Sequence, residues 1–222
     1  AVFTGDGGTS QGDFHEALNL ASTWSLPVIF CIENNGYGLS TPVNEQYAIE
    51  NLADRGDSYG IESYIIDGNN IIDVYSCVKS VVENMRKDSK PVLIEFKTFR
   101  MKGHEEASGQ AYIDDSIIEE WAKKDPISHF ESFLLKSKYL SKKEIDAIKS
   151  STSKEIDQNW SSANSYKEVD FNIENELGDV YKEHNEVKSD PKDESLREVR
   201  LVDSIKDGIY ESMEQHDNLM IM

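Results

Sequence analysis

The chain has 222 residues, of which 38% are hydrophobic and 9% aromatic, and it carries a formal net charge of -19 at pH 7. This length supports one sizeable hydrophobic core and the beginning of a second domain. The charge argues against a nucleic-acid partner, because neutralising phosphates requires clustered Lys and Arg, and Asp and Glu outnumber these here by 42 to 23. No apolar stretch approaches the roughly 20 residues of a membrane helix, so we expect a cytoplasmic protein without a membrane partner.

The first hundred residues alternate between strand and helix patterns. Short apolar runs predict strands at 1–4, 28–32, 63–66 and 92–96. Apolar residues at helical spacing predict a helix at 13–24, and further helices are expected near 48–59 and at 71–87. Asn70 is placed to cap the last of these helices. Such alternation indicates an α/β fold, in which right-handed crossovers build a parallel sheet flanked by helices.

The pattern changes after Arg100, where a polar loop over 101–115 leads into a helical C-terminal extension. Helices are expected at 117–123, 127–136 and 201–213, and the start of a strand at 218–222. Between them, the segment 161–198 is strongly acidic and poor in aliphatic residues. It predicts a solvated linker, because it cannot bury enough apolar surface to fold alone.

Two polar motifs follow neighbouring strands of the predicted sheet. Gly5-Asp6-Gly7 ends the first strand, and Glu33-Asn34-Asn35 ends the next apolar strand. Ligands of open parallel sheets bind beyond the carboxyl ends of the strands, so we expect the two motifs to lie side by side. Asp6 offers a carboxylate and Asn35 an amide oxygen, which are the ligands that magnesium takes while sharing phosphate oxygens.

The glycines of the first motif predict an anion-binding turn. Gly5, Gly7 and Gly8 allow a sharp turn and a close approach of the backbone to an anion. The helix that starts near Asp13 would direct its positive end toward the same place. Each motif alone is a common turn or strand exit, and only their combination at adjacent strand ends indicates a diphosphate and metal site.

These motifs resemble those of a known enzyme family. Gly5-Asp6-Gly7 followed by Asn34-Asn35 is similar to the signature of thiamine-diphosphate enzymes. The wider match resembles the alpha subunit of the decarboxylating component in pyruvate and branched-chain 2-oxo acid dehydrogenase complexes, and it includes Gly12, Glu16, Ala17, Asn19, Ala21, Leu26-Pro27 and 33–37. The resemblance implies the thiamine-diphosphate-binding fold and the cofactors thiamine diphosphate and Mg²⁺.

The resemblance also implies roles for individual residues. Asp6 and the Asn35 side chain would bind magnesium, and the Tyr37 carbonyl would add a third protein oxygen. Gly7 and Gly8 would contact the diphosphate. The substrate would be a 2-oxo acid, either pyruvate or a branched-chain one, and a lipoyl-bearing acyltransferase would accept the acyl group.

A second match lies at 99–104, which resembles the family's loop with an active-site histidine. The resemblance implies that His104 is catalytic, contacting the cofactor diphosphate and stabilising charge near the 2-oxo acid or its lipoyl acceptor. Arg100 is a weaker candidate that would anchor the loop or neutralise phosphate. The chain departs from kinase-regulated relatives at Glu105, where they have a serine. The other histidines are expected to be surface or helix-packing residues: His15, His129, His184 and His216. Cys31 and Cys77 are expected to be reduced core residues.

The last part of the chain resembles the opening of the family's beta subunit, at 200–205 and 217–222. We therefore expect a piece of a fused alpha-beta polypeptide that forms a homo-oligomer. The expected parts are a diphosphate-binding domain with a helical extension at 1–160, an acidic linker at 161–198 and the start of a beta-like domain at 199–222. The catalytic glutamate of the beta half would lie outside these residues, so the piece alone is expected to be inactive.

Two alternative functions remain open. One keeps thiamine chemistry but changes the reaction to that of an acetoin-cleaving or transketolase-like enzyme. The Gly103-His104 loop and the 33–37 motif argue against it. The other is a noncatalytic, acidic interaction module in which Gly5-Asp6-Gly7 is only a turn.

Overall fold

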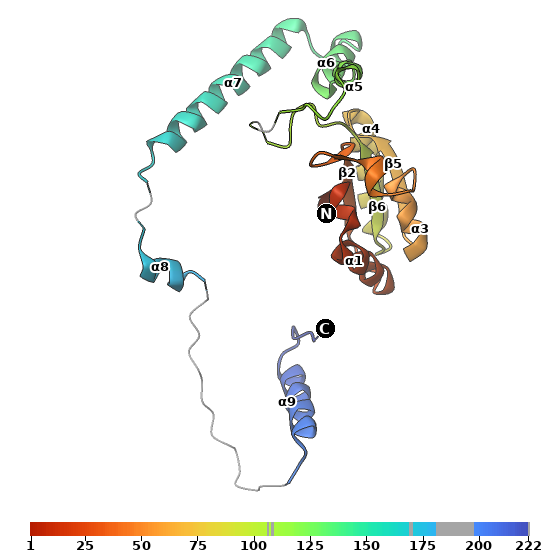
Figure 1. Cartoon of the computed structure of the whole chain (residues 1–222), viewed down its shortest axis with the longest axis vertical. Helices are drawn as coiled ribbons and strands as arrows, with labels where there is room; N and C mark the ends of the chain where they lie inside the picture. The colour runs from red at the N-terminus through yellow and green to blue at the C-terminus, as the bar shows by residue number, and fades with distance from the viewer. Residues whose placement is uncertain (106, 108, 169–170, 181–197, 222) are drawn as a thin grey trace. The chain divides into compact units, whose positions relative to one another are not determined.

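The computed structural model describes residues 1–105, 107, 109–168, 171–180 and 198–221. The chain divides into two units, Ala1–Asn164 and Ser165–Met222. The first unit contains the sheet and both polar motifs (Figure 1). The predicted division into a domain, a linker and the start of a second domain stays a prediction.

A four-stranded parallel sheet forms the centre of the first unit, as the alternating pattern predicted. Its strands, in spatial order, are β1 (Val2–Gly5), β2 (Ile29–Asn34), β6 (Val92–Lys97) and β5 (Glu62–Asp67). All three neighbouring pairs are parallel, and Gly5 at the end of β1 lies opposite Glu33 in β2. The carboxyl ends of β1 and β2 therefore meet at one edge of the sheet.

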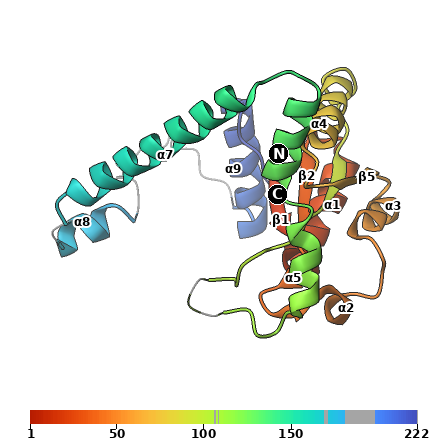
Figure 2. The same cartoon turned by 90° about the horizontal axis from the view of Figure 1, so that it is seen from above.

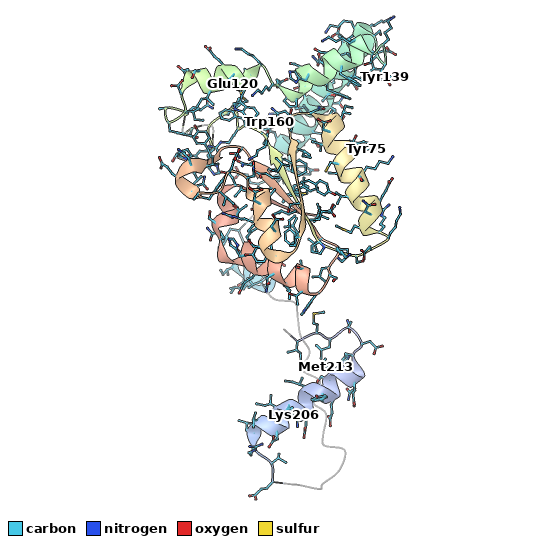
Figure 3. The ribbon with its side chains drawn as sticks, turned by 90° about the vertical axis from the view of Figure 1, so that its right-hand side faces the viewer. Tyr75, Glu120, Tyr139, Trp160, Lys206 and Met213 are labelled. Carbon is cyan, nitrogen blue, oxygen red and sulfur yellow. The ribbon has the colours of Figure 1, made fainter. Side chains whose placement is uncertain are left out.

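Helices cover both faces of the sheet, and the side chains of β2 show why. Phe30 and Ile32 pack on one face with α1 (Gly12–Thr23) and the short η2 helix (Leu52–Asp54). Ile29 and Cys31 point to the other face, which packs against α4 (Ile71–Met85). Figure 3 shows α4, which carries the labelled Tyr75, along one side of the sheet. A sheet covered on both faces needs apolar residues at successive strand positions, which accounts for the continuous apolar runs in the sequence.

The connection between β2 and β5 differs from the sequence prediction. A single helix at 48–59 was expected, but the chain forms only η2 and the five-residue α3 (Arg55–Tyr59). Asn51 is extended, with a φ of -125°, and Gly60 ends α3 in the left-handed conformation, with a φ of 66°. Three further short elements were not expected: β3 (Tyr37–Gly38), β4 (Thr41–Pro42) and α2 (Val43–Gln46).

The cap of α4 is confirmed. The Asn70 side chain accepts a hydrogen bond from the Ile72 backbone N–H at 3.2 Å. This bond satisfies one of the amides that a helix leaves unpaired at its start.

The helical extension is also present, although its boundaries differ from the prediction. It consists of α5 (Asp115–Ala122), α6 (Pro126–Lys136) and α7 (Lys142–Ser165), the last of which Figure 2 shows as one uninterrupted helix. Helix α7 continues four residues past the predicted start of the linker at 161, because its polar side chains are solvated equally well on a helix. No described helix is both long and apolar enough to cross a membrane.

The described residues of the second unit include the helices α8 (Ile173–Gly178) and α9 (Leu201–Gln215). Helix α8 lies within the segment predicted to be a solvated linker and buries no residue, and the Asn172 side chain caps it by accepting from the Asn175 backbone N–H. The rest of the predicted linker lies largely outside the described residues. The strand expected at 218–222 is absent from its described part, 218–221, because a strand requires a hydrogen-bonded neighbour and none pairs with it there.

Replacing a buried isoleucine of the sheet should destabilise the first unit more than replacing an exposed one. Ile94 is 0% exposed in β6, whereas Ile148 on α7 is 55% exposed. We expect Ile94→Ala to lower the free energy of unfolding by about 2–5 kcal/mol, because it leaves a cavity in the core. Ile148→Ala should lower it by about 1 kcal/mol or less. Urea unfolding followed by circular dichroism measures both, and equal losses would contradict the assigned core.

Candidate cofactor site

A cavity of about 460 Å³ lies beyond the carboxyl ends of β1 and β2. The residues that line it come from the β1 end, the segment after β2 and the loop after β6, and they are Gly5, Asp6, Gly7, Gly8, Asn35, Tyr37, Gly38, Leu39, Thr41, Gln46, Arg100 and His104. All six residues singled out from the sequence, Asp6, Gly7, Gly8, Asn35, Tyr37 and His104, are among them. The structure thus brings the predicted set together, and the cofactor role of each residue stays a prediction.

Asp6 is a buried carboxylate that lines this cavity. It is 1% exposed and precedes the short η1 helix (Gly7–Ser10), which its side chain does not cap. Its Oδ2 accepts a hydrogen bond from Gln46 Nε2 at 3.2 Å. None of the ion pairs among the described residues includes Asp6. A buried carboxylate whose neighbour is a neutral amide is costly, so its chemistry fits a bound cation.

Asn35 and Tyr37 supply further oxygen atoms on the other side of the cavity. Asn35 Oδ1 accepts a hydrogen bond from the Tyr37 N–H at 3.1 Å, and its second lone pair is still able to bind a cation. Gly36 between them has a φ of 88°, which favours glycine. Pro42 lies opposite Tyr37 in the β3–β4 pair and has no N–H to donate to the Tyr37 carbonyl.

The possible donors are a carboxylate, an amide and a backbone carbonyl. These are hard oxygen ligands, which suit magnesium better than metals that prefer nitrogen or sulfur. No three His, Cys, Asp or Glu side chains cluster as a metal site among the described residues. The predicted set needs no such cluster, because it has a single carboxylate and leaves further positions to phosphate and water.

Close packing accounts for two glycines of the first turn, Gly7 and Gly8, whereas a Cβ added to Gly5 would have no atom within 4 Å. A Cβ added to Gly8 would lie 2.3 Å from Thr4 Oγ1, and one added to Gly7 would lie 3.2 Å from the Gly38 Cα. The backbone of η1 therefore forms the cavity wall directly, which suits the approach of an anion such as a diphosphate. We expected the start of α1 to face the site, but the wall is formed by η1, and α1 begins only at Gly12.

The loop after β6 is held over the cavity by Arg100 and by aromatic contacts. Arg100 donates to the Lys102 carbonyl at 3.1 Å, to the Tyr112 hydroxyl at 2.8 Å and to the Leu39 carbonyl. The Tyr37 ring packs edge-on against Phe99 and Tyr112, with centroid distances of 6.1 and 5.8 Å. Because its guanidinium already has three acceptors in the protein, Arg100 fits the anchoring role better than phosphate neutralisation.

None of the other histidines and cysteines of the first unit lines this cavity. His15 Nδ1 is 2.7 Å from the Tyr59 hydroxyl, and His129 Nε2 is 2.9 Å from the Lys123 carbonyl oxygen. Both cysteines are free thiols, Cys31 being buried and Cys77 half-buried, and burial raises the pKa of both thiols. His184 lies outside the described residues, and His216 is exposed at the end of α9.

Two polar residues near the site were not found from the sequence. Gln46 reaches Asp6 from α2, a four-residue helix in a stretch without any periodic pattern, so no local signal marked it. Glu95 is 0% exposed in the middle of β6. A signal for it did exist, since a charged residue inside the apolar run 92–96 is unusual and requires a buried partner.

Comparison with known proteins agrees with the fold and identifies the family of the chain. The family model described as "Dehydrogenase E1 component" matches residues 1–172. The alpha subunit of acetoin:2,6-dichlorophenolindophenol oxidoreductase from Bacillus subtilis is 43% identical over 135 residues, which are 60% of this chain and 40% of the relative. The pyruvate dehydrogenase E1 component subunit alpha from Rickettsia typhi is 34% identical over 155 residues, covering 70% of this chain and 48% of the relative.

A plant relative matches more of the chain. The mitochondrial 2-oxoisovalerate dehydrogenase subunit alpha 2 from Arabidopsis thaliana is 35% identical over 183 residues, covering 81% of this chain and 38% of the relative. The chain thus spans half or less of the length of these three relatives. With a family match over residues 1–172, the chain belongs to the dehydrogenase E1 component family.

Proposed function

We propose that this chain is the thiamine-diphosphate-binding part of the decarboxylating component of a 2-oxo acid dehydrogenase complex, with pyruvate or a branched-chain 2-oxo acid as substrate. The observation that carries the proposal is the convergence of Asp6, Asn35, Tyr37 and His104 on one cavity, in a chain of this family. Relatives named for pyruvate and for 2-oxoisovalerate support the substrate class.

In this proposal the cavity wall holds the cofactor through its diphosphate. The Asp6 carboxylate, the Asn35 amide oxygen and the Tyr37 carbonyl bind Mg²⁺, and the Gly7 and Gly8 backbone contacts the diphosphate. Bound thiamine diphosphate supplies the electron sink that allows a 2-oxo acid to lose carbon dioxide. The protein residues fix the cofactor's position relative to the substrate. His104 is the catalytic residue, and it contacts the diphosphate and stabilises charge near the substrate or its lipoyl acceptor.

The proposal includes partners that complete the site. A lipoyl-bearing acyltransferase accepts the acyl group, and a beta-type half supplies the glutamate that activates the cofactor. The resemblance of 200–205 and 217–222 to the opening of a beta subunit supports a fused chain. The proposal further includes a homo-oligomer, by analogy with the family, and a cytoplasmic setting. The parts of the chain are then the diphosphate-binding domain at 1–160, the linker at 161–198 and the beta-like domain from 199.

Asp6→Asn tests the cofactor site. The substitution keeps the side chain's size and removes its charge, so we expect the intact protein to bind thiamine diphosphate at least about 100-fold more weakly in the presence of Mg²⁺. Isothermal titration calorimetry with and without Mg²⁺ gives the affinities. Asp54→Asn is the matched control, because Asp54 is exposed and its side chain caps no helix. Unchanged affinity in Asp6→Asn would remove the basis of the proposal.

His104→Ala tests the catalytic role. We expect the rate of acyl transfer to lipoyl to fall by about 10²- to 10⁴-fold in the intact enzyme, which is typical for the loss of an acid-base or charge-stabilising group. Urea unfolding should show little loss of stability, because the side chain lies at a cavity and not in the core. His129→Ala, on an exposed histidine of α6, serves as the control. Normal turnover in His104→Ala would defeat the assignment.

A second candidate function is the cleavage of acetoin. The relative named for acetoin is 43% identical to this chain over 135 residues, which supports this reading in spite of the motifs that favoured a 2-oxo acid. A panel of pyruvate, 2-oxoisovalerate and acetoin with dichlorophenolindophenol as electron acceptor separates the two. We expect dye reduction with a 2-oxo acid, accompanied by carbon dioxide release. Dye reduction with acetoin alone would favour the second candidate, and no reduction with any substrate would favour the transketolase-like or noncatalytic alternatives.

A further inference from the structure

Glu95 is a carboxylate placed entirely inside the protein. It lies in β6 after three buried apolar residues, Val92, Leu93 and Ile94, and is itself 0% exposed. Removing a carboxylate from water costs several kcal/mol, so such a residue requires good partners. It is not among the residues that line the cofactor cavity.

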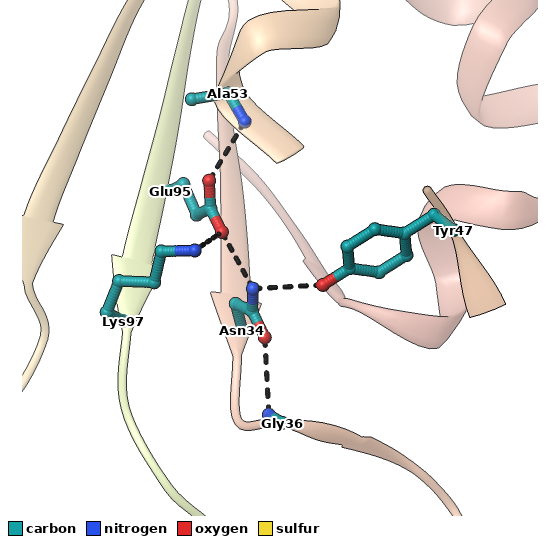
Figure 4. A network of polar contacts seen from close by, with 6 residues as sticks. All are labelled: Asn34, Gly36, Tyr47, Ala53, Glu95 and Lys97. Carbon is teal, nitrogen blue, oxygen red and sulfur yellow. Dashed lines mark hydrogen bonds and ion pairs between the residues drawn. The ribbon is translucent and has the colours of Figure 1, made fainter. Parts of the chain in front are cut away.

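Both oxygens of Glu95 have donors, as Figure 4 shows. Oε2 accepts a hydrogen bond from the Ala53 backbone N–H at 2.9 Å. Oε1 accepts from Asn34 Nδ2 at 2.7 Å and lies 2.6 Å from Lys97 Nζ. The three partners of Glu95 are all donors. The position therefore suits a charged carboxylate and disfavours a neutral amide, whose NH₂ group would face donors.

Asn34 links Glu95 to the turn that lines the cavity, because it bonds to both. Its Nδ2 also donates to the Tyr47 hydroxyl at 3.2 Å, and its Oδ1 accepts from the Gly36 N–H at 3.2 Å. A reversed amide would place oxygen against the Glu95 carboxylate and nitrogen against the Gly36 N–H, so the side chain has one favourable orientation. That orientation holds the turn from which Asn35 and Tyr37 reach the cavity.

A second branch reaches the turn that contains Asp6. The Arg55 guanidinium lies over the Tyr47 ring, 5.6 Å from its centroid, and donates to the Thr9 carbonyl. The Thr9 side chain is fully buried, and its hydroxyl donates to the Asp6 carbonyl at 2.6 Å. Buried and half-buried groups thus connect the Asp6 turn to the Asn35 turn, and none of the connecting side chains lines the cavity.

We propose that Glu95 and Asn34 are positioning residues, which hold the two cofactor-binding turns in the arrangement needed for Mg²⁺ and thiamine diphosphate. The inference rests on the proposed function and goes beyond it, because neither side chain would touch the cofactor. Groups that orient metal ligands from behind typically contribute 10- to 100-fold to metal affinity.

A charge exchange between positions 34 and 95 tests the inference. Glu95→Gln places an amide donor against donors, and Asn34→Asp places two carboxylates together. We expect each single variant of the intact protein to bind thiamine diphosphate about 10- to 100-fold more weakly with Mg²⁺ present. In the double variant, the amide introduced at 95 donates to the carboxylate introduced at 34, so most of the lost affinity should return. A role in overall stability alone would not produce this reciprocal recovery.

Two controls separate positioning from stability and from net charge. Ile94→Ala changes the residue before Glu95 in β6 and should lower the free energy of unfolding. Glu33→Gln removes an exposed carboxylate next to Asn34. Both should retain the wild-type affinity for the cofactor. Tyr47→Phe removes only the hydroxyl bonded to Asn34, and we expect it to weaken binding about 3- to 10-fold. If the single variants at 34 and 95 fail to fold, Tyr47→Phe still tests the inference.

The outcomes distinguish this inference from the proposed function. If the wild-type protein binds no thiamine diphosphate with Mg²⁺, the proposed function fails, and the inference that rests on it fails as well. If the wild-type protein binds it and the variants at 34, 47 and 95 bind equally well, only the inference is overturned. A double variant that binds no better than the weaker single variant overturns it in the same way.

Discussion

Parallel pairing between β1 and β2 is the constraint on which the candidate site depends. The pairing places Gly5 opposite Glu33, so the residues that follow each strand emerge at the same edge of the sheet. Asp6 and Asn35 are 29 positions apart in the chain, yet they line one cavity because of this register. An antiparallel pair would have sent them to opposite ends. The apolar side chains that cover both sheet faces maintain the register, since a slip of one residue would exchange the two faces.

Four of the five buried polar side chains among the described residues lie near the candidate site, and the fifth, Asn69, donates to the Lys124 carbonyl and accepts from the Thr98 hydroxyl. Asp6, Thr9, Asn34 and Glu95 are all buried at or behind the cavity wall. No buried polar side-chain atom among the described residues lacks a hydrogen-bond partner. Fully paired groups of this kind restrict the chain to one arrangement, because alternatives would leave a polar group unsatisfied. The candidate site is therefore supported by a rigid base, although several of its residues lie on loops.

The loop after β6 is attached differently, by contacts at its own ends. Arg100 binds carbonyl oxygens and a hydroxyl, and Phe99 stacks on Trp121 of α5 with a centroid distance of 5.4 Å. These contacts place His104 at the cavity while leaving it outside the buried network. In the proposed function this arrangement suits a residue that meets both the cofactor and an incoming acceptor, since a loop adjusts more readily than a strand.

Local sequence patterns predicted the alternation of strands and helices, the Asn70 cap, and the choice of Asp6 and Asn35, because periodicity and motif spacing depend on near neighbours in the chain. His104 was chosen through the family resemblance of its loop. The short elements between β2 and β5 were decided by tertiary structure, since a run such as 48–59 has no strong period and follows the surface on which it packs. The sequence likewise could not identify Gln46 or the partners of Arg100, because their contacts join segments that are distant in the chain. Glu95 is an intermediate case. The sequence showed a charged residue in an apolar strand, and only the fold showed that its carboxylate accepts a hydrogen bond from Asn34.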